Sequence, residues 1–132
     1  MRVQMTNVVL PQNGVTTVKE GTRIRIYFDY EEANITYDSP EEAETAPDNI
    51  YYCENIDVEG DQSYGAIVAA IHNGRYSNDD IQAIIGNYEL AKDETSDIAS
   101  DKREEYKADY DAWQAWRSHA KDIARKVLAE TN

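Results

Sequence analysis

The chain has 132 residues, of which 41% are apolar, and this is enough for one domain with a modest core. Its 26 acidic and 13 basic residues give a net charge of −13, so a nucleic acid or an anionic membrane would repel it. The excess of acid lies entirely in residues 1–100, since residues 101–132 hold seven acids and seven bases. This composition favours a protein that acts through contacts with other proteins.

The first sixty residues have the pattern of strands separated by turns. Between residues 22 and 30 the side chains alternate, with Ile24, Ile26 and Phe28 on one face and arginines on the other. One buried and one wet face is typical of an antiparallel sheet. We expect strands over residues 2–10, 15–19, 22–30 and 49–58, with residues 35–37 as a candidate extension of the third.

The segment from Asp38 to Asp48 interrupts this half of the chain. It holds five acids and two prolines and little that a core would bury, so we expect a mobile loop. The strand that follows contains Cys53, the only cysteine, which excludes an intramolecular disulfide and a thiolate metal cluster. The apolar stretch that ends at Cys53 predicts a buried, inert thiol.

Two helices are expected next. The first runs from Ser63 to Asn73 and ends at Gly74, a common residue at helix C-termini. Ser77 is a suitable N-cap for the second, and the aspartates after it suit the positive end of the helix dipole. Gly86 weakens this second helix by ~1 kcal/mol relative to Ala, so we expect a close packing contact there. The predicted buried stripe of the second helix is Ile81, Ile84, Ile85 and Tyr88.

A third helix is expected from about Asp101 to Ala129, with acids near its start and bases near its end. Nearly thirty residues span about 43 Å at 1.5 Å each, more than the diameter of a body of about 100 residues. Part of this helix should therefore project, or pack on another subunit. Its apolar stripe, flanked by Trp116, is Tyr106, Tyr110, Trp113, Ala120, Ile123 and Val127.

These elements predict a single α+β domain over residues 1–132, with an N-terminal antiparallel β-sheet, two short helices and one long C-terminal helix. Residues 1–60 form the β-rich part and residues 61–132 the helical part, and neither is large enough to stand alone. The start of the chain has no continuous apolar segment, and the longest apolar run is far shorter than the ~20 residues of a membrane helix. We expect a protein outside the membrane that is cytoplasmic at synthesis.

Motifs for catalysis or metal binding are incomplete. Ser63 lacks the glycine two residues before it that a nucleophile elbow requires. Asp57, Glu59 and Asp61 alternate, but a calcium loop of the EF-hand kind needs a longer ligand series. His72 and His119 lie outside any zinc-binding pattern. We therefore predict no enzyme, no cofactor and no metal.

A basic cluster near the end of the third helix raises the question of nucleic-acid binding. Asp122 and Glu130 interrupt it, and the acidic body opposes such a partner. We expect no direct contact with nucleic acid and none with a membrane. The members of the cluster are Arg117, Lys121, Arg125 and Lys126.

The tryptophans of the third helix are the strongest candidates for function. Trp113 and Trp116 lie three residues apart and are neighbours on one helix face. Interface energy concentrates in Trp, Tyr and Arg, so Tyr110, Trp113, Trp116 and Arg117 are the predicted partner-binding residues. The alternative is that both tryptophans pack on the protein's own sheet. One indole inward and one outward is the compromise we expect.

Three short strings give the chain a resemblance to a known group. They are Asn55-Ile56-Asp57-Val58-Glu59-Gly60, Ser77-Asn78-Asp79-Asp80 and Trp116-Arg117-Ser118-His119-Ala120-Lys121. Together with the β-rich start, they resemble small uncharacterised accessory proteins of gut-bacterial prophages. The resemblance implies a virion or tail component, or a helper in fibre assembly, and it implies no site residues.

Our leading hypothesis is a non-enzymatic structural or assembly protein of phage type that acts through its C-terminal aromatic helix, by binding a protein partner or by forming a homo-oligomer. The main alternative is an acidic decoy that mimics DNA and inhibits a nucleic-acid-binding protein, which the net charge of −13 motivates. An enzyme is a distant third, because it would need a pocket that gathers several of the acids from Asp57 to Asp61.

Overall fold

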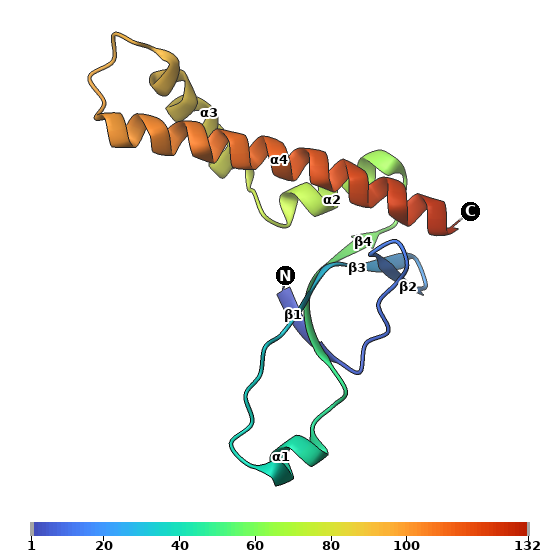
Figure 1. The fold of residues 1–132 in the computed structure, drawn as a ribbon. Helices are drawn as coiled ribbons and strands as arrows, with labels where there is room; N and C mark the ends of the chain where they lie inside the picture. Colours follow the sequence, from blue (N-terminus) through green and yellow to red (C-terminus); the bar gives the residue numbers. More distant parts are fainter. Residues whose placement is uncertain (1, 132) are drawn as a thin grey trace.

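The computed structural model describes the backbone of residues 2–131 and the side chains of residues 2–129 (Figure 1). It confirms the α+β class: a four-stranded antiparallel sheet comes first and the long helix last. The strand order in the sheet is β1-β4-β3-β2. The elements are β1 (Arg2–Thr6), β2 (Thr16–Glu20), β3 (Arg23–Glu32), α1 (Pro40–Thr45), β4 (Ile50–Glu59), α2 (Tyr64–Asn73), α3 (Asn78–Lys92) and α4 (Ser100–Thr131).

The sheet has one covered face and one open face. In β3 the apolar members of the alternation, Ile24, Ile26 and Phe28, are at most 1% exposed. In the antiparallel register Ile24 lies opposite Val58 and Ile26 opposite Ile56, so β4 adds apolar side chains to the same face. Helices α2 and α4 lie over this face of the sheet (Figure 1). The alternation in β3 therefore determines on which face of the sheet the core lies.

A β-bulge near the middle of β3 changes the register of the sheet. The pairing of β3 with β4 shifts between Phe28 and Glu31, and Asp29 has a φ of 56°, in the left-handed region. The Asp29 carboxylate lies 2.7 Å from Nε2 of His119 on α4. The bulge thus turns a polar side chain of the strand toward the long helix.

Helix α2 connects the sheet to α4. Ser63 is its N-cap and accepts a hydrogen bond from the backbone N–H of Ala66. Gly74, at the C-terminal end, has a φ of −65° rather than a left-handed value. A Cβ at Gly74 would lie 3.3 Å from the carbonyl oxygen of Ile71 and 3.4 Å from Cγ2 of Ile56. A side chain at this position would therefore be tightly packed between the end of α2 and β4.

Helix α3 and the first half of α4 form a two-helix hairpin, residues 78–112, that projects beyond the sheet (Figure 1). Ser77 and Asp80 form a capping box at the start of α3. The rings of Tyr88 and Tyr110 stack with centroids 3.8 Å apart. With 32 residues, α4 is about 48 Å long, and it packs on both α2 and α3.

Four sequence predictions are wrong in detail. Of the predicted buried stripe of α3, Ile85 is 41% exposed and the other three residues are half-buried, whereas the buried residue of this helix is Ala91. The expected mobile loop between Asp38 and Asp48 contains α1, because Ser39 caps the helix and Pro40 occupies its first turn. Residues 35–37 form no strand. Gly86 makes no close contact, since a Cβ there would meet no atom within 4 Å. The glycine in α3 is therefore on an open helix surface.

Candidate partner-binding groove

The four predicted partner-binding residues differ in how exposed their side chains are. Trp113 and Trp116 are 8% and 7% exposed, so the expectation that one indole faces outward is wrong. Tyr110 is half-buried in its stack with Tyr88, whereas Arg117 is exposed. Residues three apart on a helix lie on nearly the same side of it. The two indoles therefore face the same neighbours, and α2 and the sheet together cover both of them.

Trp116 belongs to the core. Its indole N–H donates to the carbonyl oxygen of Ile71 at 3.3 Å, and its ring lies near Phe28, with centroids 6.2 Å apart. The guanidinium of Arg75 covers the outer side of the indole, 3.6 Å from the ring centroid. Trp116 therefore joins α4 to α2 and to the sheet, which is a structural role.

Trp113 and Arg117 line a groove of about 420 Å³ between α2 and α4. Trp113, Arg117 and Lys121 follow one another at intervals of four residues, so they lie along one side of α4. From α2, the small residues Gly65 and Ala69 leave the space between the helices open. The lining residues are Tyr64, Gly65, Val68, Ala69, His72, Asn73, Trp113, Arg117 and Lys121.

A short hydrogen-bond chain fixes the wall of the groove. The indole N–H of Trp113 donates to Nε2 of His72 at 2.9 Å, so this nitrogen is the acceptor. Nδ1 of the same ring lies 2.9 Å from the side-chain oxygen of Asn73 and is then the donor. The neutral imidazole is held from both sides, and it orients the indole that forms part of the apolar floor.

The rim of the groove is basic in an otherwise acidic protein. Arg117 lies 5.1 Å above the ring of Trp113, and Arg125 lies 5.9 Å from the ring of Tyr64. Among the residues that the structure describes, the lysine and arginine ion pairs of α4 use Lys102 and Lys126. Arg117 instead donates a hydrogen bond to Oε1 of Gln114 at 3.0 Å. The groove thus combines an apolar floor with positive charge at its edge, which suits an acidic, amphipathic polypeptide.

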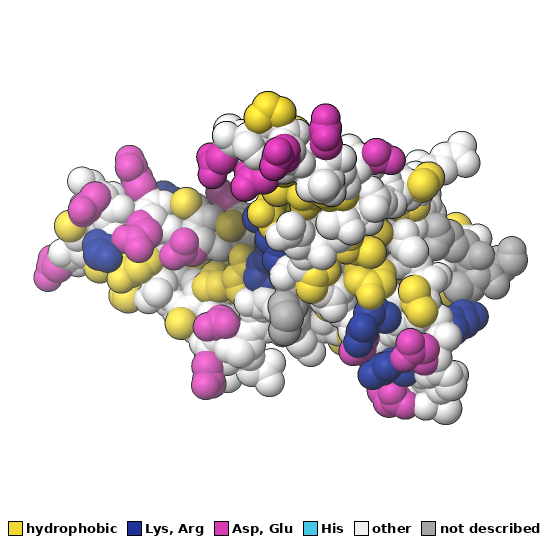
Figure 2. Space-filling view, turned by 90° about the horizontal axis from the view of Figure 1, so that it is seen from below, with side chains coloured by type: hydrophobic (Ala, Val, Ile, Leu, Met, Phe, Trp, Pro, Cys, Tyr) yellow, Lys and Arg dark blue, Asp and Glu magenta, His cyan; other side chains and the backbone are white. Residues whose placement is uncertain are grey.

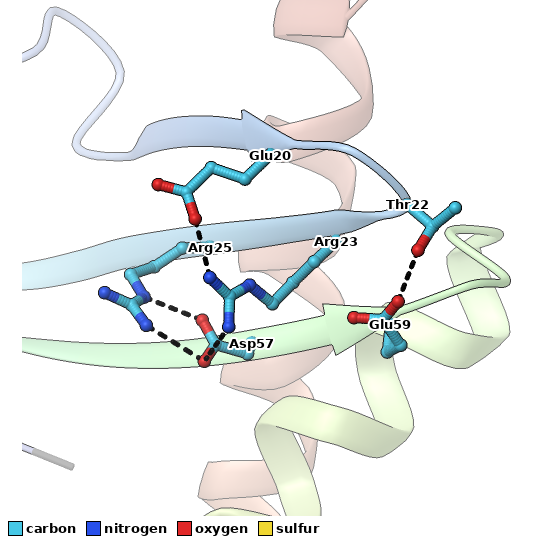
Figure 3. Close-up of polar contacts among 6 residues, drawn as sticks. All are labelled: Glu20, Thr22, Arg23, Arg25, Asp57 and Glu59. Carbon is cyan, nitrogen blue, oxygen red and sulfur yellow. Dashed lines mark hydrogen bonds and ion pairs between the residues drawn. The ribbon is translucent and has the colours of Figure 1, made fainter.

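The other candidate residues have local structural partners. Figure 3 shows that Arg25 of β3 donates to both oxygens of Asp57 on β4, at 2.7 and 3.1 Å. Arg23 donates to Glu20 at 2.6 Å, and Thr22 donates to Glu59 (Figure 3). The hydrogen bond from Arg25, together with the charges of both arginines, holds the pKa of Asp57 below its usual range.

No metal centre is assembled in the part of the chain that the structure describes, where no group of three or more potential His, Cys, Asp or Glu ligands occurs. Asp61 accepts a hydrogen bond from the backbone N–H of Ser63 at 2.9 Å. Within the described residues, the helices are too short or too polar to cross a membrane.

The open face of the sheet is a second exposed surface. Cys53 lies on this face and is 1% exposed, with its sulfur 3.5 Å from that of Met5. Burial raises the pKa of the Cys53 thiol, which keeps it protonated and unreactive.

In the view from below, hydrophobic side chains gather over the middle of the molecule, beside a cluster of basic and acidic side chains (Figure 2). The groove differs from this surface because its charge has one sign.

Sequence reasoning missed the α2 side of the groove. The signal was present, since Gly65, Ala69 and His72 share the helix side opposite the buried Ile67 and Ile71. No protein-family model, curated protein or solved structure matches the chain. What the protein does is therefore inferred from its own surfaces.

Proposed function

We propose that this chain is a non-enzymatic structural or assembly protein of phage type, and that it acts by binding a polypeptide in the groove between α2 and α4. The observation that carries the proposal is the combination of an apolar floor, formed by Val68, Ala69 and Trp113, with the cations Arg117 and Lys121 at the rim. An amphipathic segment buries its apolar side in such a groove, and its acids meet the basic rim.

Two features favour a polypeptide over a small molecule. The groove is open along both helices, as its lining runs from Tyr64 to Asn73 on one side and from Trp113 to Lys121 on the other. Its residues include the types that dominate interface energies: a tryptophan, an arginine and a tyrosine. Of the four residues predicted from sequence, Trp113 and Arg117 remain in the proposed contact surface, and Tyr110 and Trp116 stabilise the fold.

A photo-crosslinking experiment tests the proposal. Tyr64, 38% exposed at the rim of the groove, is replaced by p-benzoylphenylalanine, which is also a large aromatic side chain. The matched control carries the same group at Val18, 42% exposed on the open face of the sheet. We expect protein crosslinks at position 64 that are at least about tenfold more abundant than at position 18.

A steric variant completes this test. A Cβ at Gly65 would meet no atom within 4 Å, so the backbone tolerates a side chain there, and Gly65→Leu directs a branched side chain into the groove. Loss of glycine from the helix favours the folded state by up to ~1 kcal/mol, so the melting temperature should not fall. Crosslinking from position 64 should then be abolished. Equal crosslinking with and without the leucine contradicts a role for the groove.

The acidic decoy is the alternative proposal, and the arrangement of acids gives it less support. A decoy needs carboxylates spaced like phosphates on one continuous surface. In this protein the acids of α1 lie at the opposite end from the turn between α3 and α4, which holds a second group (Figure 1). Beside that turn, Lys92 forms an ion pair with Glu89 of α3 and Lys102 with Glu105 of α4, which further interrupts the negative surface.

A further inference from the structure

Helix α1 is an element without a visible reason to fold. It has six residues, and none of them is buried. Isolated helices shorter than about 12 residues are marginal in water, even with good caps. The N-cap Ser39 and the Pro40 at the first position favour its start but supply no packing. Such a helix is stabilised when its surface docks on something else.

The chemistry of the segment around α1 indicates what it would dock on. We call residues 35–48 the acidic arm. Its apolar side chains Ile35 and Tyr37 are 43% and 37% exposed. The arm therefore has the composition that the groove selects: exposed apolar groups among negative charges. Its acids are Asp38, Glu41, Glu42, Glu44 and Asp48.

The arm does not reach the groove of its own molecule. Helix α1 lies at the far end of the sheet, at the bottom of Figure 1, whereas α2 and α4 cover the sheet at the top. The arm is joined to β3 and β4, whose ends are fixed by the hydrogen bond from the N–H of Ala33 to the carbonyl oxygen of Ile50 at 2.9 Å. A complementary groove is thus available only on another molecule.

We propose that the acidic arm of one copy docks in the groove between α2 and α4 of a second copy. This rests on the proposed function and names its partner. The contact joins different surfaces of the two copies, so the first copy keeps its groove free and the second keeps its arm free. Repeated from copy to copy, such a heterologous contact builds rings or open filaments. The arm and groove are complementary in charge, while the net charge of −13 opposes any non-specific association.

Reciprocal charge reversal tests the contact. The arm variant is Glu41→Lys/Glu44→Lys, which leaves Glu42 to bond the backbone N–H of Asp38. The groove variant is Arg117→Glu/Lys121→Glu. In light scattering with sedimentation velocity at low salt, the wild-type mass should rise with concentration beyond that of a dimer. Each variant by itself should remain a monomer, with association weakened at least about tenfold.

Mixing the two variants is the decisive step. The reversed arm then meets the reversed groove, and the natural arm of one variant meets the natural groove of the other. An equimolar mixture should recover concentration-dependent assembly. The matched control Glu94→Lys/Asp97→Lys changes the net charge as the arm variant does, at the turn between α3 and α4, and should assemble like the wild type.

The outcomes separate this inference from the proposed function. A wild type that stays monomeric at every concentration, or a mixture that does not assemble, overturns the docking of the arm. If crosslinks from position 64 then join a different protein, the groove is still a binding site and only the partner was wrong. Crosslinks from position 64 to residues 35–48 of a second copy support both proposals.

Discussion

The two halves of α4 are buried to very different degrees. From Trp113 onward the helix packs against α2 and shares the core with the sheet, to which it supplies several buried side chains: Trp116, Ala120, Ile123, Ala124 and Val127. From Ser100 to Ala112 it packs on α3, and no side chain there is classed as fully buried; in α3 itself only Ala91 is. One continuous helix thus belongs to a body of helices packed on a sheet and to a two-helix hairpin.

The difference shows how the same secondary structure is stabilised in two ways. In the body, the sheet, α2 and α4 exclude water from a common core, and the helix is held by burial. In the hairpin, caps, the stack of Tyr88 on Tyr110 and hydrogen bonds at the turn hold the helices together. We expect the hairpin to open locally at a lower free-energy cost than the body, and amide hydrogen exchange measures both.

Phe28→Ala should have the largest effect, because it removes a ring that is 1% exposed at the centre of the body. Large cavities of this kind cost about 3–5 kcal/mol. Tyr88→Ala in the hairpin should cost only about 1–2 kcal/mol, since its ring is half-buried. Urea unfolding of the two variants measures the ratio, and equal losses would mean that the hairpin is part of the same cooperative core.

Arg103→Ala should loosen the hairpin and leave the body intact. The guanidinium donates to the carbonyl oxygens of Ala91 at 2.7 Å, Asp93 at 3.0 Å and Ser96 at 3.3 Å, which closes the turn between the helices. Losing this charged donor should cost about 2 kcal/mol, seen as faster hydrogen exchange in residues 88–106.

Arg103→Lys is the matched control for this loss, because it keeps the charge without the planar fork. The lysine variant should restore only a small part of the protection of these amides from hydrogen exchange. If the alanine variant instead accelerates exchange equally in β3 and β4, the two regions are not separable.

Gly86→Ala should stabilise the hairpin. The position is in the interior of α3, and a Cβ there would meet no atom within 4 Å. Replacing a helical glycine by alanine gains up to ~1 kcal/mol. Hydrogen exchange should slow in α3 and hardly change in the sheet. A loss of stability would reveal a contact on this face of α3.

Acid should weaken the body through Asp57, which is the smallest of these effects. Its folded-state pKa is lowered by the hydrogen bond from Arg25, whereas an unfolded aspartate titrates near ~3.9. The unfolded state therefore binds the proton first, and the stabilisation present above pH ~4 is lost as the pH falls through the folded value. Thermal melts of wild type and Asp57→Asn at pH 7 and pH 3 should differ less at pH 3.

The main architecture of this protein follows from local patterns in its sequence. The alternation at Ile24, Ile26 and Phe28 predicted the buried face of β3, and Ser77 predicted the start of α3. The long helix was expected over residues 101–129 and spans Ser100–Thr131. These features depend on neighbouring residues, so a pattern a few residues long contains the information.

The features that were not predicted depend on residues far apart in the chain. Whether Trp113 faces outward is decided by α2, about 40 residues earlier, whose His72 accepts its indole N–H. The groove exists because Gly65 and Ala69 on α2 are small where they face α4, which requires the packing of the two helices. Helix α1 differs in its reason: its cap signals at Ser39 and Pro40 are local, but the many acids around them have the composition typical of a disordered segment.

The placement of both tryptophans has a spectroscopic consequence. Trp113 and Trp116 are the only two indoles of the chain, and they lie where α4 passes from the hairpin into the body. Intrinsic fluorescence therefore reports on this junction. A Trp113→Phe protein leaves the emission of Trp116 in the core, and a Trp116→Phe protein leaves that of the groove wall beside His72. The natural chain thus contains its own pair of optical probes, one for the folding of the body and one for the occupancy of the groove.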